Sequence, residues 1–339
     1  MSPSLRIAVL WRPGRNVEMQ RAFTGEDIPD DALEEAILLR DGLTAAGHEA
    51  CLVRWEPDPA ETLAELRVLA SQLVFNVSSD KEAALLHAAG IPYCGSGIGL
   101  IALDKAARKK IMLHDGVLTP PFVVVVPDGK AKGSEVSVSD IGRGWEPEPP
   151  MEYPLFVKPV EGRGSAGVSD DSIVTNRREL HRQVQAITGQ LGQGALVENY
   201  IQGREVTVGI IGDPPVVLEP LEIEYRSAKT NSFEHKQDRE IMHCPARVSH
   251  EERERVIKEA LRAFEVLGAR DFARVDTILA HDGRPWVLEL NTFAGLHMVT
   301  GKERHLHASY IGAMAKAMGL SAAEILSRIV DSAQKRYQI

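Results

Sequence analysis

The sequence predicts a mixed fold class, in which an α/β unit near the N-terminus is followed by α+β structure toward the C-terminus. Short apolar runs alternate with helical stretches over residues 5–97, which is typical of a parallel sheet with helices on both faces. Further along, Asp282-Gly283 separates two apolar runs, and this dipeptide is a strong signal for a β-hairpin. The 339 residues are 44% hydrophobic and 26% charged, so cores of ordinary size are expected for two or three domains.

The N-terminal part is expected to contain three strands, each followed by a helix. Gly47 and Gly90 mark the ends of two of these helices, because glycine readily adopts the left-handed conformation that closes a helix. We expect strands at 5–10, 50–54 and 73–77, and helices at 31–46, at 60–70 and before Gly90.

The middle of the chain is predicted to differ from this alternation. A basic helix over residues 98–115 is followed by strands at 122–126 and 155–157. Between these strands, residues 127–152 are polar and rich in Gly, Ser and Pro. We expect 130–150 to form an exposed loop or the edge of a sheet.

The C-terminal part is expected to be antiparallel. Residues 194–211 indicate a strand, a turn and a strand, and the apolar periodicity of 249–267 predicts an amphipathic helix. The hairpin follows, with strands at 273–279 and 286–290, and the last 25 residues predict a helix. The sequence contains no internal repeat.

Composition and charge exclude several classes of function. A net charge of −9 argues against a general nucleic-acid surface, which needs basic residues. No apolar run reaches the ~18 residues of a membrane span, and the N-terminus lacks the pattern of a signal peptide. Cys51, Cys94 and Cys244 form neither a CxxC nor a zinc spacing, which suits a reducing cytosol. We therefore expect a cytoplasmic protein that binds neither nucleic acid nor a membrane.

Four polar residues lie at alternate positions of the predicted C-terminal hairpin. Arg274 and Asp276 belong to its first strand, Glu289 and Asn291 to its second, and alternate residues of a strand share a face. Two carboxylates and an amide oxygen suit Mg²⁺, which prefers oxygen ligands and shares them with phosphates. The arginine would stabilise negative charge that develops in a transition state. The alternative interpretation is a ladder of surface salt bridges.

A second candidate site lies in the stretch LFVKPVEGRGSAGV at residues 155–168. Lys158 directly follows an apolar strand, and a loop with three glycines occupies residues 162–167. The backbone N–H groups of such a loop bind anions closely, and the lysine adds a positive charge for phosphate. The spacing is not that of a P-loop, and a flexible hairpin loop with a surface lysine is the alternative.

Two further stretches carry charged residues at regular spacing. Glu198 and Glu205 in LVENYIQGRE would hold adenine and ribose through hydrogen bonds, or else belong to an ordinary turn with solvated acids. Lys105 and Lys109 share a helix face, which by itself indicates a solvated basic surface.

In this order the stretches resemble the ATP-grasp superfamily and, within it, the D-alanine–D-alanine ligase family. The resemblance covers residues 73–301, and its matching segments are GIPYCGSGIGLIALDKAARKK (90–110), LTPPFVVV, YPLFVKP with the glycine loop, LVENYIQGREVTVGIIG (196–212), CPA (244–246) and FARVDTIL…WVLELNTFAGL (272–296). It implies an ATP-grasp fold with a Rossmann-like α/β domain at 1–104, a central lid subdomain at 105–193 and a C-terminal α+β catalytic subdomain at 194–339. ATP would lie between the last two parts, and the family suggests a homodimer.

The resemblance also implies a reaction and a set of site residues. ATP activates a carboxylate as an acyl phosphate, which then reacts with an amine. The implied ligands of two Mg²⁺ ions, with Mn²⁺ as an alternative, are Asp276, Glu289 and Asn291. The residues implied for ATP are Lys105, Lys158, Gly164, Ser165, Gly167, Glu198, Ile201, Glu205 and Lys236. The residues implied in catalysis are Arg274, Ser165 and Gly295, the last through its backbone.

The chain departs from the family pattern where the family binds its amino-acid substrates. The family's Gly-Gly-x-Ser-x-Glu stretch is replaced by WRPGRNVE, in which Glu18 is the nearest substitute. The first of two serines in the glycine loop becomes Gly164, and a tyrosine of a later loop becomes Gln237. Thr300 and Lys302 lie where the second substrate's carboxylate would bind. We therefore expect small carboxylate and amine substrates other than two D-alanines.

Two other functions stay open at this point: a ligase with a non-amino nucleophile, and a nucleotide-binding regulatory module without ligase activity. The intact set of polar residues on the hairpin disfavours the second. His235 and His243 flank the predicted active-site loop and are either a general base or polar loop residues. The other residues considered are interpreted as surface, pocket or buried positions without a zinc or nucleophile role: His297, His305, His307, Cys244 and Trp286.

Overall fold

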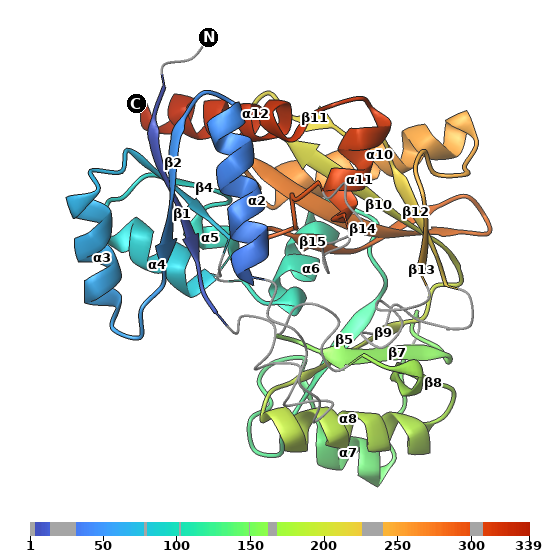
Figure 1. The fold of residues 1–339 in the computed structure, drawn as a ribbon. Coiled ribbons are helices and arrows are strands. Elements are labelled where there is room, and N and C mark those ends of the chain that lie inside the picture. Colours follow the sequence, from blue (N-terminus) through green and yellow to red (C-terminus); the bar gives the residue numbers. More distant parts are fainter. Residues whose placement is uncertain are drawn as a thin grey trace.

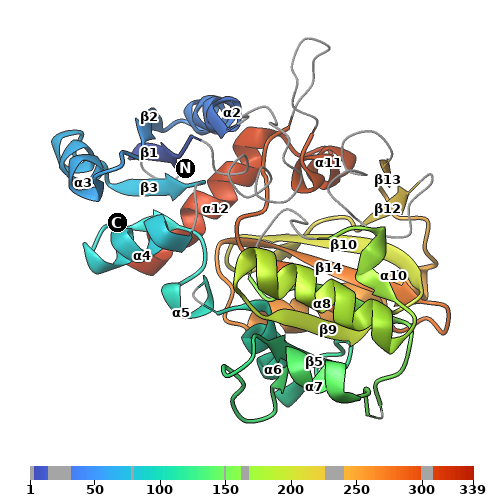
Figure 2. The ribbon, with the colours of Figure 1, turned by 90° about the horizontal axis from the view of Figure 1, so that it is seen from below.

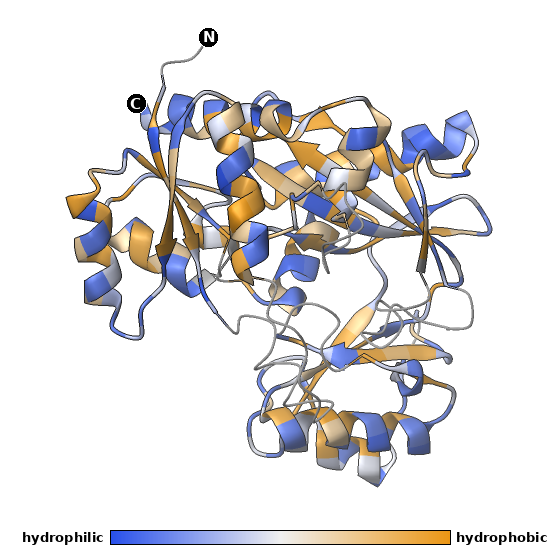
Figure 3. Ribbon diagram, viewed as in Figure 1, coloured by the Kyte–Doolittle hydropathy of each residue, from blue (hydrophilic) through white to orange (hydrophobic). Residues whose placement is uncertain are grey.

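The computed structural model describes residues 4–13, 32–77, 80–101, 103–148, 150–161, 168–225, 240–298 and 308–339. The strands described form three sheets, which lie in separate parts of the molecule (Figure 1). Figure 3 shows that the strands are mainly hydrophobic and that the helices expose hydrophilic faces. The predicted combination of α/β and α+β structure is confirmed.

The N-terminal sheet is parallel, with the order β2-β1-β3-β4. Its strands are β1 (Arg6–Trp11), β2 (Glu49–Arg54), β3 (Leu73–Asn76) and β4 (Tyr93–Cys94), and its helices are α2 (Ala32–Ala45), α3 (Pro59–Val68) and α4 (Asp80–Ala88). Alternate residues of β1 are buried on opposite faces: Ile7 and Val9 pack with α2, and Ala8 and Leu10 pack with α3 and α4. The strands and helices predicted for this part are confirmed.

The central sheet has the order β6-β5-β9-β7-β8 and is antiparallel except between β5 and β6. It consists of β5 (Phe122–Val126), β6 (Val136–Ser137), β7 (Leu155–Pro159), β8 (Ile173–Val174) and β9 (Ala195–Asn199). The helices α7 (Val138–Arg143) and α8 (Arg177–Leu191) cover one face, below the sheet in Figure 1.

The sequence analysis missed both helices of the central part. Residues 130–150 contain the predicted sheet edge, β6, but also α7, which begins with a capping box formed by Ser137 and Asp140. The helix α8 begins at Asn176, whose side chain accepts a hydrogen bond from the Glu179 N–H, and it ends at Gly192 with φ +63°. Both caps can be recognised in the sequence. Around α7, however, the density of Gly and Pro favoured the prediction of a loop.

The C-terminal sheet has the order β13-β12-β10-β14-β15, with β11 paired to β10. Its strands are β10 (Gly203–Ile211), β11 (Val216–Val217), β12 (Leu221–Tyr225), β13 (Glu240–His243), β14 (Phe272–Ala280) and β15 (Pro285–Asn291). The helix α10 (His250–Val266) packs on one face, so the predicted amphipathic helix and the predicted hairpin β14–β15 are both confirmed.

Two predicted helices are each divided into two. The helix expected at 98–115 consists of α5 (Ile98–Ile101) and α6 (Lys105–His114), because the Asp104 side chain accepts a hydrogen bond from the Ala107 N–H and starts a new helix. The C-terminal helix consists of α11 (Tyr310–Ala317) and α12 (Ala322–Tyr337), because Gly319 adopts φ +72° and Ser321 forms a capping box with Glu324.

The last helix connects two parts of the fold. In Figure 2, α12 lies between the N-terminal and C-terminal sheets, and its buried residues share one core with both. The predicted domain boundaries at residues 104 and 193 stay a prediction; β9, which follows the second boundary, pairs with β5 and β7 of the central sheet. None of the helices in the described ranges is long and apolar enough to cross a membrane.

Candidate active site

The hairpin β14–β15 brings the four predicted polar residues together on one face. Arg274 lies opposite Asn291, and Asp276 lies opposite Glu289. Residues directly opposite each other in an antiparallel pair point to the same side of the sheet. The spacing argument from the sequence therefore describes this face correctly.

A β-bulge between the two strands allows Glu289 to share a face with Asp276 while Val287 stays in the core on the other face. The register shifts after Asp276, so that Thr277 pairs with Val287 and Leu288 is the additional residue. Val287 is thereby buried against α10, whereas Glu289, only two residues later, points to the opposite face. Regular alternation would have placed both side chains on the same side.

Asp276 is the most heavily bonded residue of this face. Its carboxylate accepts two hydrogen bonds from Arg274, at 2.8 Å each, and one from the Thr207 hydroxyl at 2.6 Å. The Asn291 side-chain N–H donates a further one at 2.7 Å. These bonds fix the carboxylate, and they orient the amide oxygen of Asn291 for other use.

Arg274 carries a largely buried positive charge. Burial lowers the pKa of its guanidinium, but the charge of Asp276 and the hydrogen bonds to it outweigh this effect, and the pKa lies above its ordinary value. The guanidinium also lies 4.8 Å from the centre of the Tyr310 ring, a cation–π distance. Arg274 is therefore a permanent, positioned cation beside two carboxylates.

A second charged cluster lies where α6 meets the central sheet. Glu198 on β9 forms ion pairs with Lys158 on β7 at 2.7 Å and with Lys109 on α6 at 2.9 Å. Lys109 also donates a hydrogen bond to the Thr119 hydroxyl at 2.6 Å. The expectation of a solvated surface is wrong for Lys109, whose side chain is 1% exposed, because α6 turns this side chain toward Glu198.

The two lysines differ in their protonation equilibria. Burial lowers the pKa of Lys109 to about 8, against the opposing charge of Glu198. Burial also lowers the pKa of Lys158, but the charges of Glu198 and Glu289 outweigh it, so that the pKa is raised. Burial raises the pKa of Glu198, and the two lysines reverse this shift and lower it. Glu289 acts electrostatically on both lysines, so the lysine cluster and the hairpin face form one charged site.

Three further residues predicted for ATP lie in the described ranges. Lys105 is the first residue of α6, and its N–H donates to the Val160 carbonyl next to the predicted glycine loop. Glu205 accepts a hydrogen bond from the Tyr225 hydroxyl at 2.9 Å, a partner that the sequence analysis did not identify. Ile201 is half-buried in the turn between β9 and β10.

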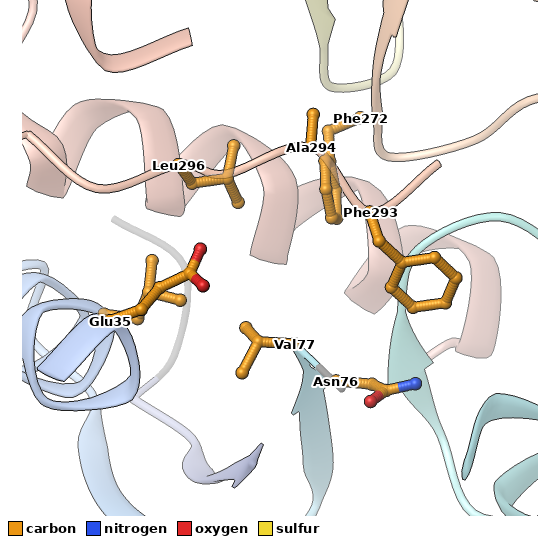
Figure 4. Close-up of a pocket in the computed structure, with 8 residues that line it drawn as sticks. Glu35, Asn76, Val77, Phe272, Phe293, Ala294 and Leu296 are labelled. Atoms are coloured by element: carbon orange, nitrogen blue, oxygen red, sulfur yellow. The ribbon is translucent and has the colours of Figure 1, made fainter. Parts of the chain in front are cut away.

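The segment after β15 leads from the hairpin to a pocket beside the N-terminal sheet. Gly295 lies in this segment, and a Cβ atom built on it would be 3.5 Å from the Glu35 carboxylate and 3.4 Å from the His297 ring. The pocket lies between α2, the end of β3 and residues 293–296 (Figure 4). Sequence reasoning placed His297 in the pocket or at the surface, and it did not identify Glu35.

Several predicted residues lie outside the described ranges. They are Glu18, Gly164, Ser165, Gly167, Lys236, Thr300 and Lys302, together with His235, Gln237, His305 and His307.

Three other candidates have local roles. His243 lies 2.8 Å from the Glu224 carboxylate on the outer strands β12 and β13. The Cys244 thiol donates to the backbone carbonyls of Glu219 and Pro220, and burial raises its pKa to about 11, which fits a structural residue. Trp286 was expected in the core, but it is only partly buried, with the Arg284 guanidinium 5.2 Å from its ring.

The donor set of the hairpin face suits a hard divalent cation. Two carboxylates and the Asn291 amide oxygen supply the oxygen ligands that Mg²⁺ prefers, and Mg²⁺ completes its coordination with water and phosphate oxygens. Among the residues of the described ranges, no three His, Cys, Asp or Glu side chains gather as a closed metal site. The oxygen donors of this face could hold a divalent metal together with phosphate oxygens of a ligand.

Comparisons with known proteins agree with these features. A family model described as "D-ala D-ala ligase C-terminus" matches residues 111–331. A D-alanine–D-alanine ligase from Nitratidesulfovibrio vulgaris is 32% identical over 318 residues, which cover 89% of this chain and 93% of the relative. Another, from Desulforudis audaxviator, is 31% identical over 317 residues, which cover 89% of this chain and 95% of the relative.

Two solved structures have the same fold. A D-alanine–D-alanine ligase from Bacillus anthracis complexed with ATP gives a TM-score of 0.71 at 21% identity, with 99% of each chain covered. The VanG D-Ala:D-Ser ligase from Enterococcus faecalis gives a TM-score of 0.72 at 20% identity, with 98% of this chain and 100% of the other covered. At these identities the likeness establishes the fold.

Proposed function

Because the chain belongs to the D-alanine–D-alanine ligase family and is an ATP-dependent, ADP-forming carbon–nitrogen ligase, we propose that it joins two amino-acid-like substrates that are not both D-alanine. One contrast carries the proposal. The charged groups proposed for nucleotide and metal lie on β7, β9, β14 and β15, whereas the sequence departs from the family pattern at WRPGRNVE, Gly164 and Gln237, where the family binds its amino-acid substrates.

The nucleotide half of the proposed site uses the two charged clusters. Lys105 and Lys158 contact the phosphates of ATP, with the loop at 162–167 and Lys236 completing the phosphate site. Glu198 holds Lys158 in place through its 2.7 Å ion pair, while Glu198, Ile201 and Glu205 line the adenosine pocket.

Asp276, Glu289 and Asn291 are the proposed ligands of two Mg²⁺ ions, with Mn²⁺ as an alternative. Held by these three side chains, a divalent metal would supply positive charge to offset the negative charge that develops on the phosphate oxygens. Thr207 holds the Asp276 carboxylate by a hydrogen bond of 2.6 Å, so that this ligand is positioned before nucleotide binds.

The reaction proceeds in two steps. A carboxylate oxygen of the first substrate attacks the γ-phosphorus, and ADP leaves with the bonding electron pair. The amine nitrogen of the second substrate then attacks the acyl carbon, and phosphate leaves. Arg274 and the Gly295 N–H stabilise the oxyanion of the tetrahedral intermediate, and Ser165 assists from the glycine loop. Exclusion of water protects the acyl phosphate from hydrolysis.

The remaining expectations belong to the same proposal. Glu18, Thr300 and Lys302 are proposed to contact the substrates. The domain boundaries after residues 104 and 193, a homodimer, and a cytoplasmic location are proposed from the family resemblance.

An ADP-release screen tests the proposed substrates. Carboxylates and amines are supplied in pairs, products are identified by mass, and a pair of D-alanines is the reference. We expect ADP release and a condensed product with at least one pair that exceeds the reference. Normal turnover with two D-alanines as the best pair would contradict the substrate proposal, and products with hydroxy acids would indicate a non-amino nucleophile.

A further inference from the structure

The ring of Tyr310 lies over the guanidinium of Arg274, the proposed stabiliser of the oxyanion. The guanidinium carbon is 4.8 Å from the centre of the ring, and the arginine side chain is 17% exposed. A cation–π contact is worth most where water is largely excluded from the cation. Tyr310, which the sequence analysis did not identify, therefore contacts a cation that the proposed reaction uses.

The two hydrogen bonds between Arg274 and Asp276 use one edge of the guanidinium. The Nε–H donates to Oδ1 and an Nη2–H donates to Oδ2, both at 2.8 Å. A guanidinium carries five N–H donors, so three of them, including both on Nη1, lie outside this pair. These three are the donors that Arg274 can offer to a ligand.

A pair of bonds on one edge leaves the guanidinium plane one way to move. Two parallel bonds fix the edge, but the plane can still tilt about that edge as about a hinge. A ring that packs against the face of the plane opposes the tilt, because any tilt changes the distance between the cation and the ring. The Asp276 carboxylate and the Tyr310 ring together therefore determine where Nη1 points.

The backbone that carries the ring is itself held in place. Tyr310 is the first residue of α11, and the preceding Ser309 caps this helix by accepting a hydrogen bond from the Gly312 N–H at 3.0 Å. The Ser309 hydroxyl donates to the His297 carbonyl at 3.0 Å, and its N–H donates to the same carbonyl at 3.1 Å. At Gly312 any side chain would collide with this carbonyl, so α11 packs directly against the segment after β15.

The helix α11 is also anchored in the core. Ile311 and Met314 are fully buried beside Leu218 and Leu221 of the C-terminal part, and Tyr310 packs against the same core while staying partly exposed. The ring thus rests on a fixed base and reaches from it to the cation, which is the arrangement of a supporting residue.

We propose that Tyr310 is a positioning residue for Arg274, whose ring sets the tilt of the guanidinium plane so that Nη1 faces the oxyanion of the tetrahedral intermediate. This assignment deepens the proposed function and rests on it. Tyr310 acts through Arg274 rather than on the substrate. The property that matters is the aromatic face, so phenylalanine can replace tyrosine and an aliphatic side chain cannot.

The alternative role of Tyr310 is structural, as part of the contact between α11 and the core. A structural role would make the protein less stable when the ring is removed, but it would leave the turnover of the folded enzyme and the order of the Arg274 side chain unchanged. This difference decides the test.

Three variants separate the two roles. Tyr310→Phe keeps the ring, and Tyr310→Leu removes it while retaining an apolar side chain. The matched control is Tyr337→Leu on α12, which removes a ring at the same distance, 4.8 Å, from the guanidinium of Arg336. ADP release is measured with the best substrate pair of the screen, and Tm is measured for each variant.

We expect Tyr310→Leu to lower kcat by about tenfold to thirtyfold, the value of a cation–π contact with a largely desolvated cation. The KM for ATP should stay unchanged, because Arg274 is proposed to act at the acyl carbon. Tyr310→Phe should retain kcat within about twofold. Tyr337→Leu should lower Tm and retain kcat.

A double variant tests whether Tyr310 acts through Arg274. Arg274→Lys removes the guanidinium, so adding Tyr310→Leu to it should cause no further loss of kcat. A full additional loss in the double variant would show that Tyr310 contributes by another route and would overturn the assignment.

The order of the guanidinium is measured directly by NMR relaxation of the arginine side-chain N–H groups, with the Arg274 signal assigned by its loss in Arg274→Lys. We expect the Nε–H to be ordered in the wild type and in Tyr310→Phe. In Tyr310→Leu its order parameter should fall below about 0.6, the range of flexible groups. Tyr337→Leu should leave the Arg274 signal as in the wild type.

The proposal fails if Tyr310→Leu keeps both the turnover and the Arg274 order of the wild type, or if Tyr310→Phe loses as much as Tyr310→Leu. The NMR measurement needs no turnover, so the two proposals can fail separately. An active wild type whose Arg274 is equally ordered in Tyr310→Leu would remove the assignment and leave the ligase function. An inactive wild type whose Arg274 becomes mobile in Tyr310→Leu would keep the contact and remove the proposed reaction.

Discussion

Four charged side chains of the site are almost completely buried, and each has a partner of opposite charge. Lys109, Lys158, Glu198 and Asp276 are between 1% and 7% exposed. A buried charge without a partner is so costly that it would lose or gain a proton instead. Such groups are kept where their charge is used, which is the reason to assign them to a nucleotide site.

Glu289 provides the sharpest test of the hairpin face. Glu289→Gln keeps the shape of the side chain but removes the charge that would hold a metal. We expect ADP release to fall by about 10² or more, which is typical when a positioned electrostatic group is removed from an active site. The control is Glu251→Gln on α10, whose side chain is 83% exposed. Wild-type turnover of Glu289→Gln would remove this residue from the metal site.

Lys109 predicts a dependence of stability on pH. Its pKa is about 8 in the folded protein, below the ordinary value of 10.5. A lysine whose pKa is lowered by folding loses its proton in the native state first, so its burial becomes less costly as pH rises from about 8 to about 10.5. Between pH 7 and 9.5 we expect wild type to gain about 2 kcal/mol relative to Lys109→Met.

The measurement for Lys109 is urea unfolding of both proteins at the two pH values. Comparison with Lys109→Met cancels most other titrating groups. An unchanged difference in the free energy of unfolding would show that Lys109 keeps its proton throughout.

At the scale of the element, the strand β14 is anchored by the residue that precedes it. Asp271, just before β14, is 1% exposed and adopts φ +61°, a conformation that favours glycine. Its carboxylate accepts hydrogen bonds from the Gly95 N–H, the Ser332 hydroxyl and the Arg336 guanidinium. Arg336 in turn donates to the Tyr93 carbonyl, so one carboxylate joins α12, the end of β4 and the strand that carries Arg274 and Asp276.

Replacing Asp271 separates the backbone effect from the ion pair. Asp271→Ala leaves the Arg336 charge poorly compensated and retains a Cβ in the left-handed region, and we expect a loss of about 3–5 kcal/mol. Asp271→Gly loses the same partner but relieves the backbone, so it should be about 1 kcal/mol less destabilised than Ala. Denaturant unfolding measures both, and a Gly variant less stable than Ala would contradict the backbone argument.

At the scale of the whole molecule, the proposed site is assembled from the central sheet, the C-terminal sheet and the helix α6. The lysines proposed to contact phosphate come from α6 and the central sheet, and the proposed metal ligands come from the C-terminal sheet. Ligands that contact these parts bind the folded protein and not the unfolded chain, so they stabilise the whole assembly.

ATP with Mg²⁺ should therefore raise the Tm. At a hundred times the dissociation constant the stabilisation is about 2.7 kcal/mol, which corresponds to a rise of a few degrees for a chain of this size. Chelation of the metal with EDTA should remove most of this rise, and Glu289→Gln should behave like the chelated wild type. Thermal unfolding followed by circular dichroism measures the shift, and an equal rise without metal would contradict a shared metal–phosphate site.

The sequence by itself determined most of the elements and supplied the residues proposed for the nucleotide half of the site. The N-terminal alternation, the helix at 250–266 and the hairpin were readable because burial of one face imposes a period of two or 3.6 residues on the chain. Strand periodicity paired Arg274 with Asp276 and Glu289 with Asn291, whereas the β-bulge after Asp276, which only the structure shows, brings the two pairs onto one face. The breaks after α5 and α11 were missed, although Asp104 and Ser321 are ordinary helix caps.

Only the tertiary structure decided which charges meet. Lys109 and Glu198 are 89 positions apart, Asp271 and Arg336 are 65 apart, and Glu35 and His297 come from opposite ends of the chain. Local periodicity indicates whether a side chain faces the interior, but it does not indicate which distant residue that side chain contacts. The structure alone therefore showed that a helix face predicted to be a solvated basic surface carries a lysine buried in an ion-pair cluster.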